Sequence, residues 1–288
     1  MKPKILISGA AGSTGSIATQ LLVERGFPVR ALVRKEDQRS EKLKALGAEV
    51  VAANILDFRA IQPVFEGIQR AYFCYPVAPG IVQATVDFAQ AALDAKVEYI
   101  VNISQRTCRE DAIANSAIQH WLAELVFDRC GVPVTHLRPT AFNEWLLYFR
   151  HKIRDGEYTV PFSPNGKFAP ISARDHAEVI AALLADPAEH IGKTYPLLGP
   201  VELTPPQIAE AVSKTLGKEV RYRQVSPEEW VQIVFGGDFA WGAEHLKGIV
   251  QQHARGDMAG TNDIVERITG HKPESVPEFV ERNRAAFA

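Results

Sequence analysis

The sequence has few cysteines, almost no excess of charge of either sign and no long apolar run, and each shortage excludes a class of protein. The three cysteines, Cys74, Cys108 and Cys130, form no CxxC pair, so neither a disulfide scaffold nor a thiolate zinc site is predicted. With 32 Lys and Arg against 34 Asp and Glu, no bulk charge draws the chain to nucleic acid or an anionic membrane. No apolar stretch approaches the length of a membrane span, and the N-terminus does not resemble a signal peptide. We therefore expect a cytoplasmic protein without nucleic-acid or membrane partners.

A glycine-rich turn near the N-terminus is the strongest motif. Gly9, Gly12 and Gly15 follow an apolar run, and a helical pattern and a second apolar run come after them. This order is that of one βαβ dinucleotide-binding unit. Glycine permits the tight turn, lets a pyrophosphate approach the backbone and lets the helix pack closely. Ser13 and Thr14 add hydroxyl donors at the helix N-terminus, which favours anions.

The end of the second apolar run indicates which dinucleotide binds. A ribose-reading residue belongs about 20 residues beyond the glycines, and an NAD site has a carboxylate there. This chain has Arg34, followed by Lys35, with Arg39 close by. An arginine fork suits a 2′-phosphate, so NADP(H) is the predicted cofactor. The alternative is that Arg34 is an ordinary solvated charge at a strand end.

Strand and helix patterns alternate regularly through residue 139 and include one helix predicted over residues 60–68. Because crossovers are right-handed, this predicts a doubly wound parallel α/β sheet. We expect residues 1–139 to form the dinucleotide-binding Rossmann core, and we leave open a return of later segments to it. Residues 140–288 are expected to form mainly a smaller, mostly helical domain on the substrate side, since Thr204 and Ser226 each mark a helix start before a proline.

Segments that resemble a known family are spread over nearly the whole chain. They are GAAGSTG, ALVRK, FCYP, DAKVEYIVNIS, GVPVTHLRPTAFNE and the long stretch from GKFAPIS to YPLLGP. In this order they resemble the NmrA-like group of atypical short-chain dehydrogenases/reductases. The resemblance implies NADP(H) binding on a Rossmann domain with a small substrate-side domain. Members include quinone reductases, triphenylmethane dye reductases, relatives of isoflavone reductases and non-catalytic redox-sensing regulators.

The resemblance extends the set of candidate cofactor-binding residues. FCYP corresponds to the family segment that ends the fourth strand, which adds Tyr75 and Pro76. Asn54 follows the third strand, where many members have Asp, and its amide can still hydrogen-bond adenine. The complete candidate set is Gly9, Gly12, Ser13, Thr14, Gly15, Arg34, Lys35, Asn54, Tyr75 and Pro76.

The residues that would supply a proton differ from those of most short-chain dehydrogenases. Their Tyr-x-x-x-Lys pattern on the helix after the fifth strand is replaced by Ser116 and His120. The candidate catalytic residues are His120 and Ser104. His120 is a candidate because the unperturbed pKa of histidine, about 6.5, lies near working pH. The alternative is that His120 is a solvated or core residue of its helix. We favour an acceptor that needs little acid, with His120 orienting the substrate or the nicotinamide ribose.

Aromatic residues follow the sixth predicted strand, at the edge of the expected cleft. Phe142, Trp145, Tyr148 and Phe149 fit a hydrophobic core and the wall of an apolar ligand pocket equally well, because the two share composition. The candidate substrate-pocket residues are Gln105, Phe142, Asn143 and Trp145.

Two other groups of polar residues are not predicted to be sites. Ser104, Asp111 and His120 lack the GxSxG elbow of a hydrolytic triad. Asp175, His176 and His190 lack tight ligand spacing, so no metal is expected. Asp175 is instead expected at the start of a helix, where its charge is favourable.

Two functions of different classes fit these observations. The first is an NADPH-dependent reductase that transfers a hydride to a small, apolar, conjugated acceptor, such as a quinone, enone, imine or cationic dye. The second is a non-catalytic NADP(H)-sensing regulator that acts through a protein partner. An enzyme needs a mostly apolar cavity over the nicotinamide, whereas a sensor does not. We favour the enzyme, with a small molecule as partner, and we also consider a homodimer.

Overall fold

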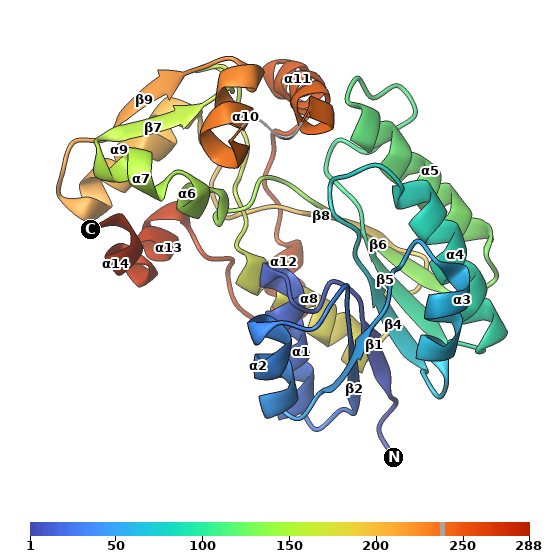
Figure 1. The fold of residues 1–288 in the computed structure, drawn as a ribbon. Helices are drawn as coiled ribbons and strands as arrows, with labels where there is room; N and C mark the ends of the chain where they lie inside the picture. The colour runs from blue at the N-terminus through green and yellow to red at the C-terminus, as the bar shows by residue number, and fades with distance from the viewer. Residues whose placement is uncertain (237–239) are drawn as a thin grey trace. The chain divides into compact units, whose positions relative to one another are not determined.

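We describe the protein from a computed structural model, in which residues 1–236 and 240–288 are described (Figure 1). The chain divides into two compact units, each built from three segments. Unit 1 comprises Met1–Gln105, Gln119–Arg138 and His176–Tyr195. Unit 2 comprises Arg106–Ile118, Pro139–Asp175 and Pro196–Ala288. A late segment thus belongs to the same unit as the N-terminal residues, while the assignment of cofactor and substrate roles to separate domains stays a prediction.

A seven-stranded sheet with the strand order β3-β2-β1-β4-β5-β6-β8 organises unit 1. Its strands are β1 (Ile5–Ile7), β2 (Val29–Val33), β3 (Glu49–Ala52), β4 (Arg70–Phe73), β5 (Tyr99–Ile103), β6 (Val134–Pro139) and β8 (Thr194–Leu197). The pairs from β3 through β6 are parallel. The strand order reverses between β1 and β4, which is the point where such sheets bind ligands. The predicted doubly wound parallel fold is confirmed.

Helices cover both faces of this sheet. They are α1 (Ser13–Glu24), α2 (Gln38–Ala45), α3 (Phe58–Ile61), α4 (Ile81–Asp94), α5 (Asn115–Arg129), α8 (Ala173–Ala185) and the 3₁₀ turn η1 (Gln62–Phe65). Figure 1 shows α1 and α2 on one face and α3, α4 and α5 on the other. The prediction of a single helix over residues 60–68 is wrong. It is divided into α3 and η1 at Pro63, which has no backbone N–H to continue a helix.

Four phenylalanines form the centre of the core between the sheet and α4. The rings of Phe65 and Phe73 meet that of Phe88 at centroid distances of 4.8 and 4.9 Å, and Phe127 lies 5.2 Å from Phe73. All four side chains are fully buried. Their edge-to-face contacts contribute about 0.5–1.5 kcal/mol each beyond the burial of apolar area. This cluster fixes α4 and α5 against the strands.

Unit 2 is mostly helical and contains one small parallel sheet of β7 (Glu157–Val160) and β9 (Arg221–Gln224). Its helices are α6 (Trp145–Tyr148), α7 (Arg150–Arg154), α9 (Pro205–Leu216), α10 (Pro227–Phe235), α11 (Ala240–Ala254), α12 (Ile264–Thr269), α13 (Val276–Arg282) and α14 (Arg284–Phe287). The predicted helix starts are confirmed, because Thr204 and Ser226 cap α9 and α10 through their side chains.

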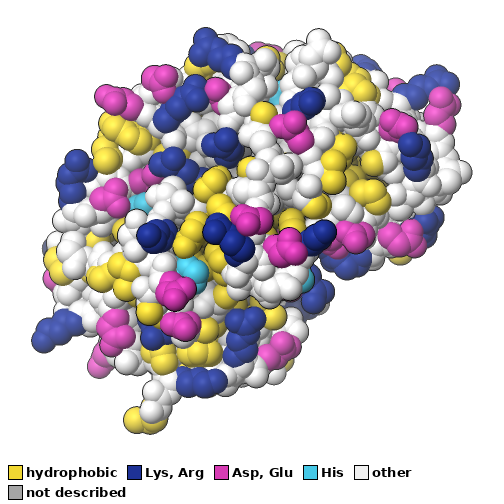
Figure 2. Space-filling model, turned by 180° about the vertical axis from the view of Figure 1, so that it is seen from behind, with side chains coloured by type: hydrophobic (Ala, Val, Ile, Leu, Met, Phe, Trp, Pro, Cys, Tyr) yellow, Lys and Arg dark blue, Asp and Glu magenta, His cyan; other side chains and the backbone are white. Residues whose placement is uncertain are grey.

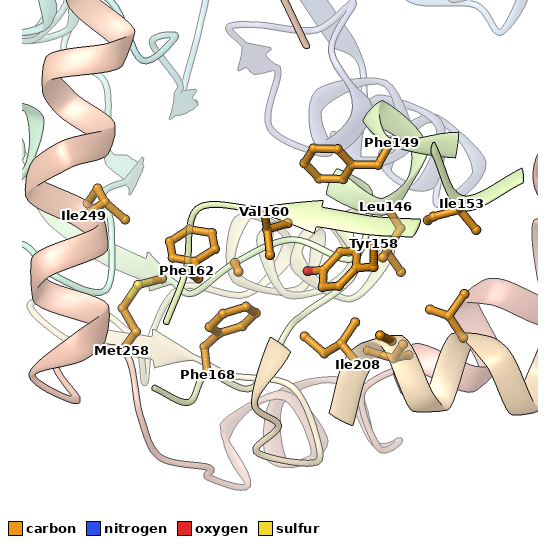
Figure 3. Close-up of a cluster of buried hydrophobic side chains, with 14 of the residues drawn as sticks. Leu146, Phe149, Ile153, Tyr158, Val160, Phe162, Phe168, Ile208, Ile249 and Met258 are labelled. Atoms are coloured by element: carbon orange, nitrogen blue, oxygen red, sulfur yellow. The ribbon is translucent and has the colours of Figure 1, made fainter. Parts of the chain in front are cut away.

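The aromatic set after β6 divides between core and surface. Phe149 is buried in the core of unit 2, and Figure 3 shows it above Tyr158, whose ring lies 6.1 Å away. Trp145 stacks on Phe162 at 6.2 Å. Tyr148 is 54% exposed. The set therefore does not act as one wall, because neighbouring residues on these short helices point in different directions.

The surface carries charges of both signs without a dominant patch on the face drawn in Figure 2, where Lys and Arg lie among Asp and Glu. This matches the formal net charge of −2. Within the described residues, no helix is both long and apolar enough to span a membrane.

His253 generates a prediction about stability at low pH. The rings of Phe162 and Phe168 lie 4.9 and 5.0 Å from it. Neither of its ring nitrogens has a hydrogen-bond partner among the described residues, and burial lowers its pKa to about 4. The unfolded chain takes up this proton near pH 6.5, so the stability that neutral His253 supports is complete above pH 6.5 and is lost as pH falls toward 4.

We expect wild-type protein to lose about 1.4 kcal/mol of unfolding free energy per pH unit from this residue between pH 6.5 and 4. His253→Leu should be less stable at pH 7 but should lose less between pH 7 and 5. Urea unfolding at both pH values measures the difference, with His151→Leu on the surface of α7 as the control. An unchanged pH dependence in His253→Leu would contradict the assignment.

Candidate functional site

The turn that leaves β1 has a backbone conformation that favours glycine. Gly9 has a φ of +62°, in the left-handed region. The Gly12 N–H donates to the Gly9 carbonyl at 2.9 Å and closes the turn. Beneath it, Ser8 Oγ accepts from the Cys74 N–H at 2.7 Å and donates to the Cys74 carbonyl. These bonds join the ends of β1 and β4 at the sheet's reversal point.

Gly12 and Gly15 are glycines for different reasons. A Cβ on Gly15 would lie 2.4 Å from the Gly9 carbonyl oxygen and 2.9 Å from Ala10 Cα, so the backbones leave no room for a side chain. A Cβ on Gly12 would meet only the Gly9 oxygen, at 3.2 Å. The φ of Gly12, −82°, is ordinary for any residue. Gly12 therefore presents open backbone that a ligand can approach.

The N-terminus of α1 is available to an anion. Gly12 is its N-cap and provides no side-chain hydrogen bond, and no acidic residue lies in the first turn. By contrast, Asp37 caps α2 and accepts from two backbone N–H groups. Unpaired N–H groups and the helix dipole together favour a phosphate. Ser13 and Thr14 begin α1 with accessible side chains.

A cavity of about 710 Å³ lies beside this turn, within the size range of ligand sites. All of its lining residues belong to unit 1. Seven predicted cofactor-binding residues line it: Gly9, Gly12, Arg34, Lys35, Asn54, Tyr75 and Pro76. The other three, Ser13, Thr14 and Gly15, form the first turn of α1. The donor set therefore fits a dinucleotide whose pyrophosphate lies on the glycine turn.

Arg34 and Lys35, which follow β2, are two cations that line this cavity. Neither forms an ion pair with another described residue. Both are exposed. Arg39 also lines the cavity, but its guanidinium binds Asp37 at 2.6 Å. Mainly through that hydrogen bond, Arg39 lowers the pKa of Asp37 to about 2. Arg34 and Lys35 are thus the better placed charges for a ligand phosphate.

The lining of the cavity also contains an amide and a phenol. Asn54 Oδ1 accepts from the Leu56 N–H at 3.2 Å, which leaves the amide N–H₂ group as donor. The Tyr75 hydroxyl donates to the Pro79 carbonyl at 2.8 Å and holds the proline loop after β4. Burial raises the pKa of Tyr75, and the positive charge of Arg34 opposes this. Arg34 and Tyr75 therefore lie close enough to interact.

The candidate catalytic residues His120 and Ser104 are both buried in unit 1. One turn beyond His120 on α5 lies Glu124, whose Oε1 accepts from Arg138 Nε at 2.9 Å. Burial raises the pKa of Glu124, but hydrogen bonds from Arg138, and then Ser104, lower it below its usual value. The sequence analysis missed this ion pair. Its partners lie 14 positions apart on two different elements, so no local pattern predicts it.

Ser116 does not share a unit with His120. It lies in unit 2, where its Oγ is 2.6 Å from Nδ1 of His245 on α11. Burial lowers the pKa of His245 to about 4, so this imidazole is neutral at pH 7. The indole of Trp241 stacks on it at 5.8 Å. The contact joins residues 129 positions apart, so no local sequence pattern predicts it.

The predicted substrate-pocket residues fall in both units. Gln105 ends the first segment of unit 1, and the other three belong to unit 2. Asn143 is buried, and its Nδ2 donates to the Glu274 carbonyl at 3.3 Å. Phe142 pairs with Ile171 through a β-bridge. Asn143 and Phe142 thus each have a structural contact, and the pocket role of the four residues stays a prediction.

The two other polar groups are also placed. Asp111 is in unit 2 and pairs with Arg109 at 2.8 Å, whereas Ser104 and His120 are in unit 1. Asp175 lies in the first turn of α8, as predicted, and accepts from Ser172 Oγ at 2.7 Å. No cluster of three or more potential metal ligands occurs among residues 1–236 and 240–288.

Comparisons with known proteins identify one family and one fold, the family through a family model and the fold through solved structures. The model of the NmrA-like family matches residues 1–280. An NAD(P)H azoreductase from Xenophilus azovorans is 29% identical, covering 98% of this chain and 99% of its own. An NADPH-dependent quinone oxidoreductase from Escherichia coli, solved with NADPH, is similar with a TM-score of 0.85 and 23% identity, covering 97% and 99%. A triphenylmethane reductase from Citrobacter sp., solved with NADP(H), has a TM-score of 0.83 and 22% identity over the same shares.

We predict that substitutions at Gly12 and Gly15 have different effects. Gly12→Val should fold and lose tight dinucleotide binding, because its side chain would occupy the open backbone. Gly15→Ala should instead lower the thermal unfolding midpoint, because its Cβ meets backbone atoms. Calorimetric titration with NADPH and thermal unfolding of both variants separate the effects. Tight binding by a folded Gly12→Val protein would contradict this site.

We predict that Arg34 determines the preference for NADPH over NADH. One charge-assisted hydrogen bond contributes about 1.5–3 kcal/mol, so Arg34→Ala should weaken NADPH binding about tenfold to a hundredfold. The affinity for NADH, which lacks the 2′-phosphate, should barely change. Arg39→Ala is the matched control and should lose less, because Arg39 is already paired with Asp37. Equal losses for both cofactors in Arg34→Ala, measured by calorimetry, would show that Arg34 does not read the phosphate.

Proposed function

The chain belongs to the NmrA-like family, and on this basis we propose that it is a reductase that uses NADPH to reduce a small, apolar, electron-poor acceptor. The observation that carries the proposal is the cavity at the glycine turn. It is lined by two cations without ion pairs among the described residues and by Gly12, which begins α1 without a side-chain cap. NADPH supplies the hydride when it is bound. Quinones, enones, imines, azo compounds and cationic dyes are the acceptors proposed. The names of the similar azoreductase, quinone oxidoreductase and dye reductase support this range.

The groups available for proton transfer support an electron-poor acceptor. Ser116 replaces the tyrosine of most short-chain dehydrogenases, and an aliphatic hydroxyl is a weak acid. Its partner His245 is neutral at pH 7, since burial lowers its pKa to about 4. A ketone needs a proton as hydride arrives, and a positioned acid is worth about 10²–10⁴-fold. A quinone or a cationic carbon accepts hydride with little such help.

His120 is proposed to orient ligands rather than to supply protons. His120 is 5% exposed, and the Glu124–Arg138 pair fixes α5 to the end of β6 one turn further along. A rigid imidazole at this place can position the substrate or the nicotinamide ribose by hydrogen bonding.

A panel of acceptors tests the proposal. Purified protein should oxidise NADPH faster with quinones, azo compounds or cationic dyes than with simple ketones, and faster with NADPH than with NADH. Gly12→Val is the matched inactive control. If NADPH binds tightly but no acceptor in the panel increases its oxidation, the regulator is the better assignment.

His120 can be tested in the same assay. We expect His120→Ala and His120→Gln to change KM for a quinone more than kcat, with no titration lost between pH 5.5 and 8.5. His151→Ala, an exposed histidine on α7, is the control. A large fall in kcat together with loss of a titration near pH 6–7 would assign the acid role to His120 and contradict this proposal.

A further inference from the structure

The residue at which α5 begins cannot cap the helix with its own side chain. The Ala114 carbonyl accepts from the N–H groups of Ala117 and Ile118 at 2.9 and 3.3 Å, which makes Ala114 the N-cap. Alanine has no side-chain oxygen to offer the first turn. In a capping box, a Glu or Gln at the third helical position accepts from the N-cap N–H. That position is Ala117 here, so the box cannot form locally.

A distant side chain, Gln252 on α11, makes the missing contact. Its Oε1 accepts from the Ala114 N–H at 3.2 Å, which is the bond that a local capping box would provide. Its Nε2 donates to the Thr107 carbonyl at 3.5 Å. Gln252 is fully buried. Because an unpaired buried amide is costly, a side chain bonded at both ends fixes the two backbone segments that it joins.

Helix α11 passes the start of α5 in direct backbone contact. A Cβ on Gly248 would lie 2.4 Å from Ala114 Cα, so α11 needs a glycine at this place. His245, Gly248 and Gln252 follow one another at steps of three and four, which places them on one side of α11. His245 contacts Ser116. One side of α11 thus contacts α5 at its N-cap and in its first turn.

We propose that Gln252 is a positioning residue of the reductase, which fixes where α5 begins and thereby places Ser116 toward the acceptor. This inference rests on the proposed function. Ser116 replaces the tyrosine of most short-chain dehydrogenases, and His120 follows one turn later on the same helix. If α5 began one residue earlier or later, Ser116 would turn by about 100° around the helix axis. Misplacement of this kind weakens the positioning of a substrate.

The segment before α5 has other anchors, so the loss of one contact leaves the fold in place. Arg109 Nη2 pairs with Asp257 Oδ2 at 2.8 Å, and Arg106 Nη2 donates to the Ala259 carbonyl at 3.3 Å. Ile249 of α11 belongs to the apolar core of unit 2 (Figure 3). Removal of the Gln252 amide should therefore alter the start of α5 without releasing α11.

Steady-state kinetics of Gln252→Met, which has a similar volume but no amide, tests this role. With a quinone as acceptor, KM should rise about threefold to tenfold, as for the loss of one hydrogen bond, and kcat should change less. The dissociation constant for NADPH should stay the same, because Gln252 does not line the dinucleotide cavity. KM does not depend on the fraction of enzyme that is folded. A merely structural role would therefore lower the thermal unfolding midpoint without changing KM.

Two further variants serve as controls. Gln251→Met changes the exposed neighbouring position of α11 and should keep the wild-type KM. Gln252→Glu should recover most of the wild-type KM, because its carboxylate still accepts from the Ala114 N–H at a helix N-terminus. If Gln252→Met does not fold, Gln252→Asn replaces it and should also raise KM, since an amide one methylene shorter cannot reach Ala114 and Thr107 together.

The outcomes separate this role from the proposed function. A wild-type KM in folded Gln252→Met, or an equal rise in Gln251→Met, overturns the positioning role while the reductase assignment stands. A wild-type protein that reduces no acceptor overturns the proposed function and this role with it.

Discussion

The close approach of α1 to the turn after β1 is the constraint on which the functional site depends. The backbones meet at Gly15, where a Cβ would lie 2.4 Å from the Gly9 carbonyl oxygen. This contact aims the uncapped N-terminus of α1 at the place where the sheet order reverses. Arg34 and Lys35 at the end of β2 line the same cavity. The proposed anion site is therefore built from backbone geometry first and from side chains second.

The sequence predicts this part of the molecule well because its signals are local. Glycine spacing and apolar periodicity predict β1, α1 and β2, and the doubly wound sheet and the NmrA-like family are both confirmed. The division of one predicted helix at Pro63 shows how a single residue overrides periodicity. The return of residues 176–195 to unit 1 was left open, since β8 joins the sheet through long-range hydrogen bonds that no local pattern specifies.

The polar pairs could not be predicted from the sequence, because they too depend on long-range contacts. Glu124 with Arg138 and Ser116 with His245 are tertiary contacts, the second joining residues 129 positions apart. The spacing of Ser116 and His120 suggested a local pair in place of Tyr and Lys. The structure instead assigns Ser116 a neutral, half-buried imidazole. For the proposed reductase, we therefore expect the rate to depend more on how the acceptor is positioned and how readily it takes a hydride than on a strong acid.

Transfer of deuterium tests this account most directly. NADPH labelled with deuterium at C4 of the nicotinamide would be incubated with the protein and a quinone, an azo compound or a cationic dye, and the products analysed by mass spectrometry. We predict that label from one face of the nicotinamide leaves the cofactor in step with acceptor reduction and is found in the dye product at carbon. Tight NADPH binding with the label retained on the cofactor in every case would contradict a reductase and favour a sensor.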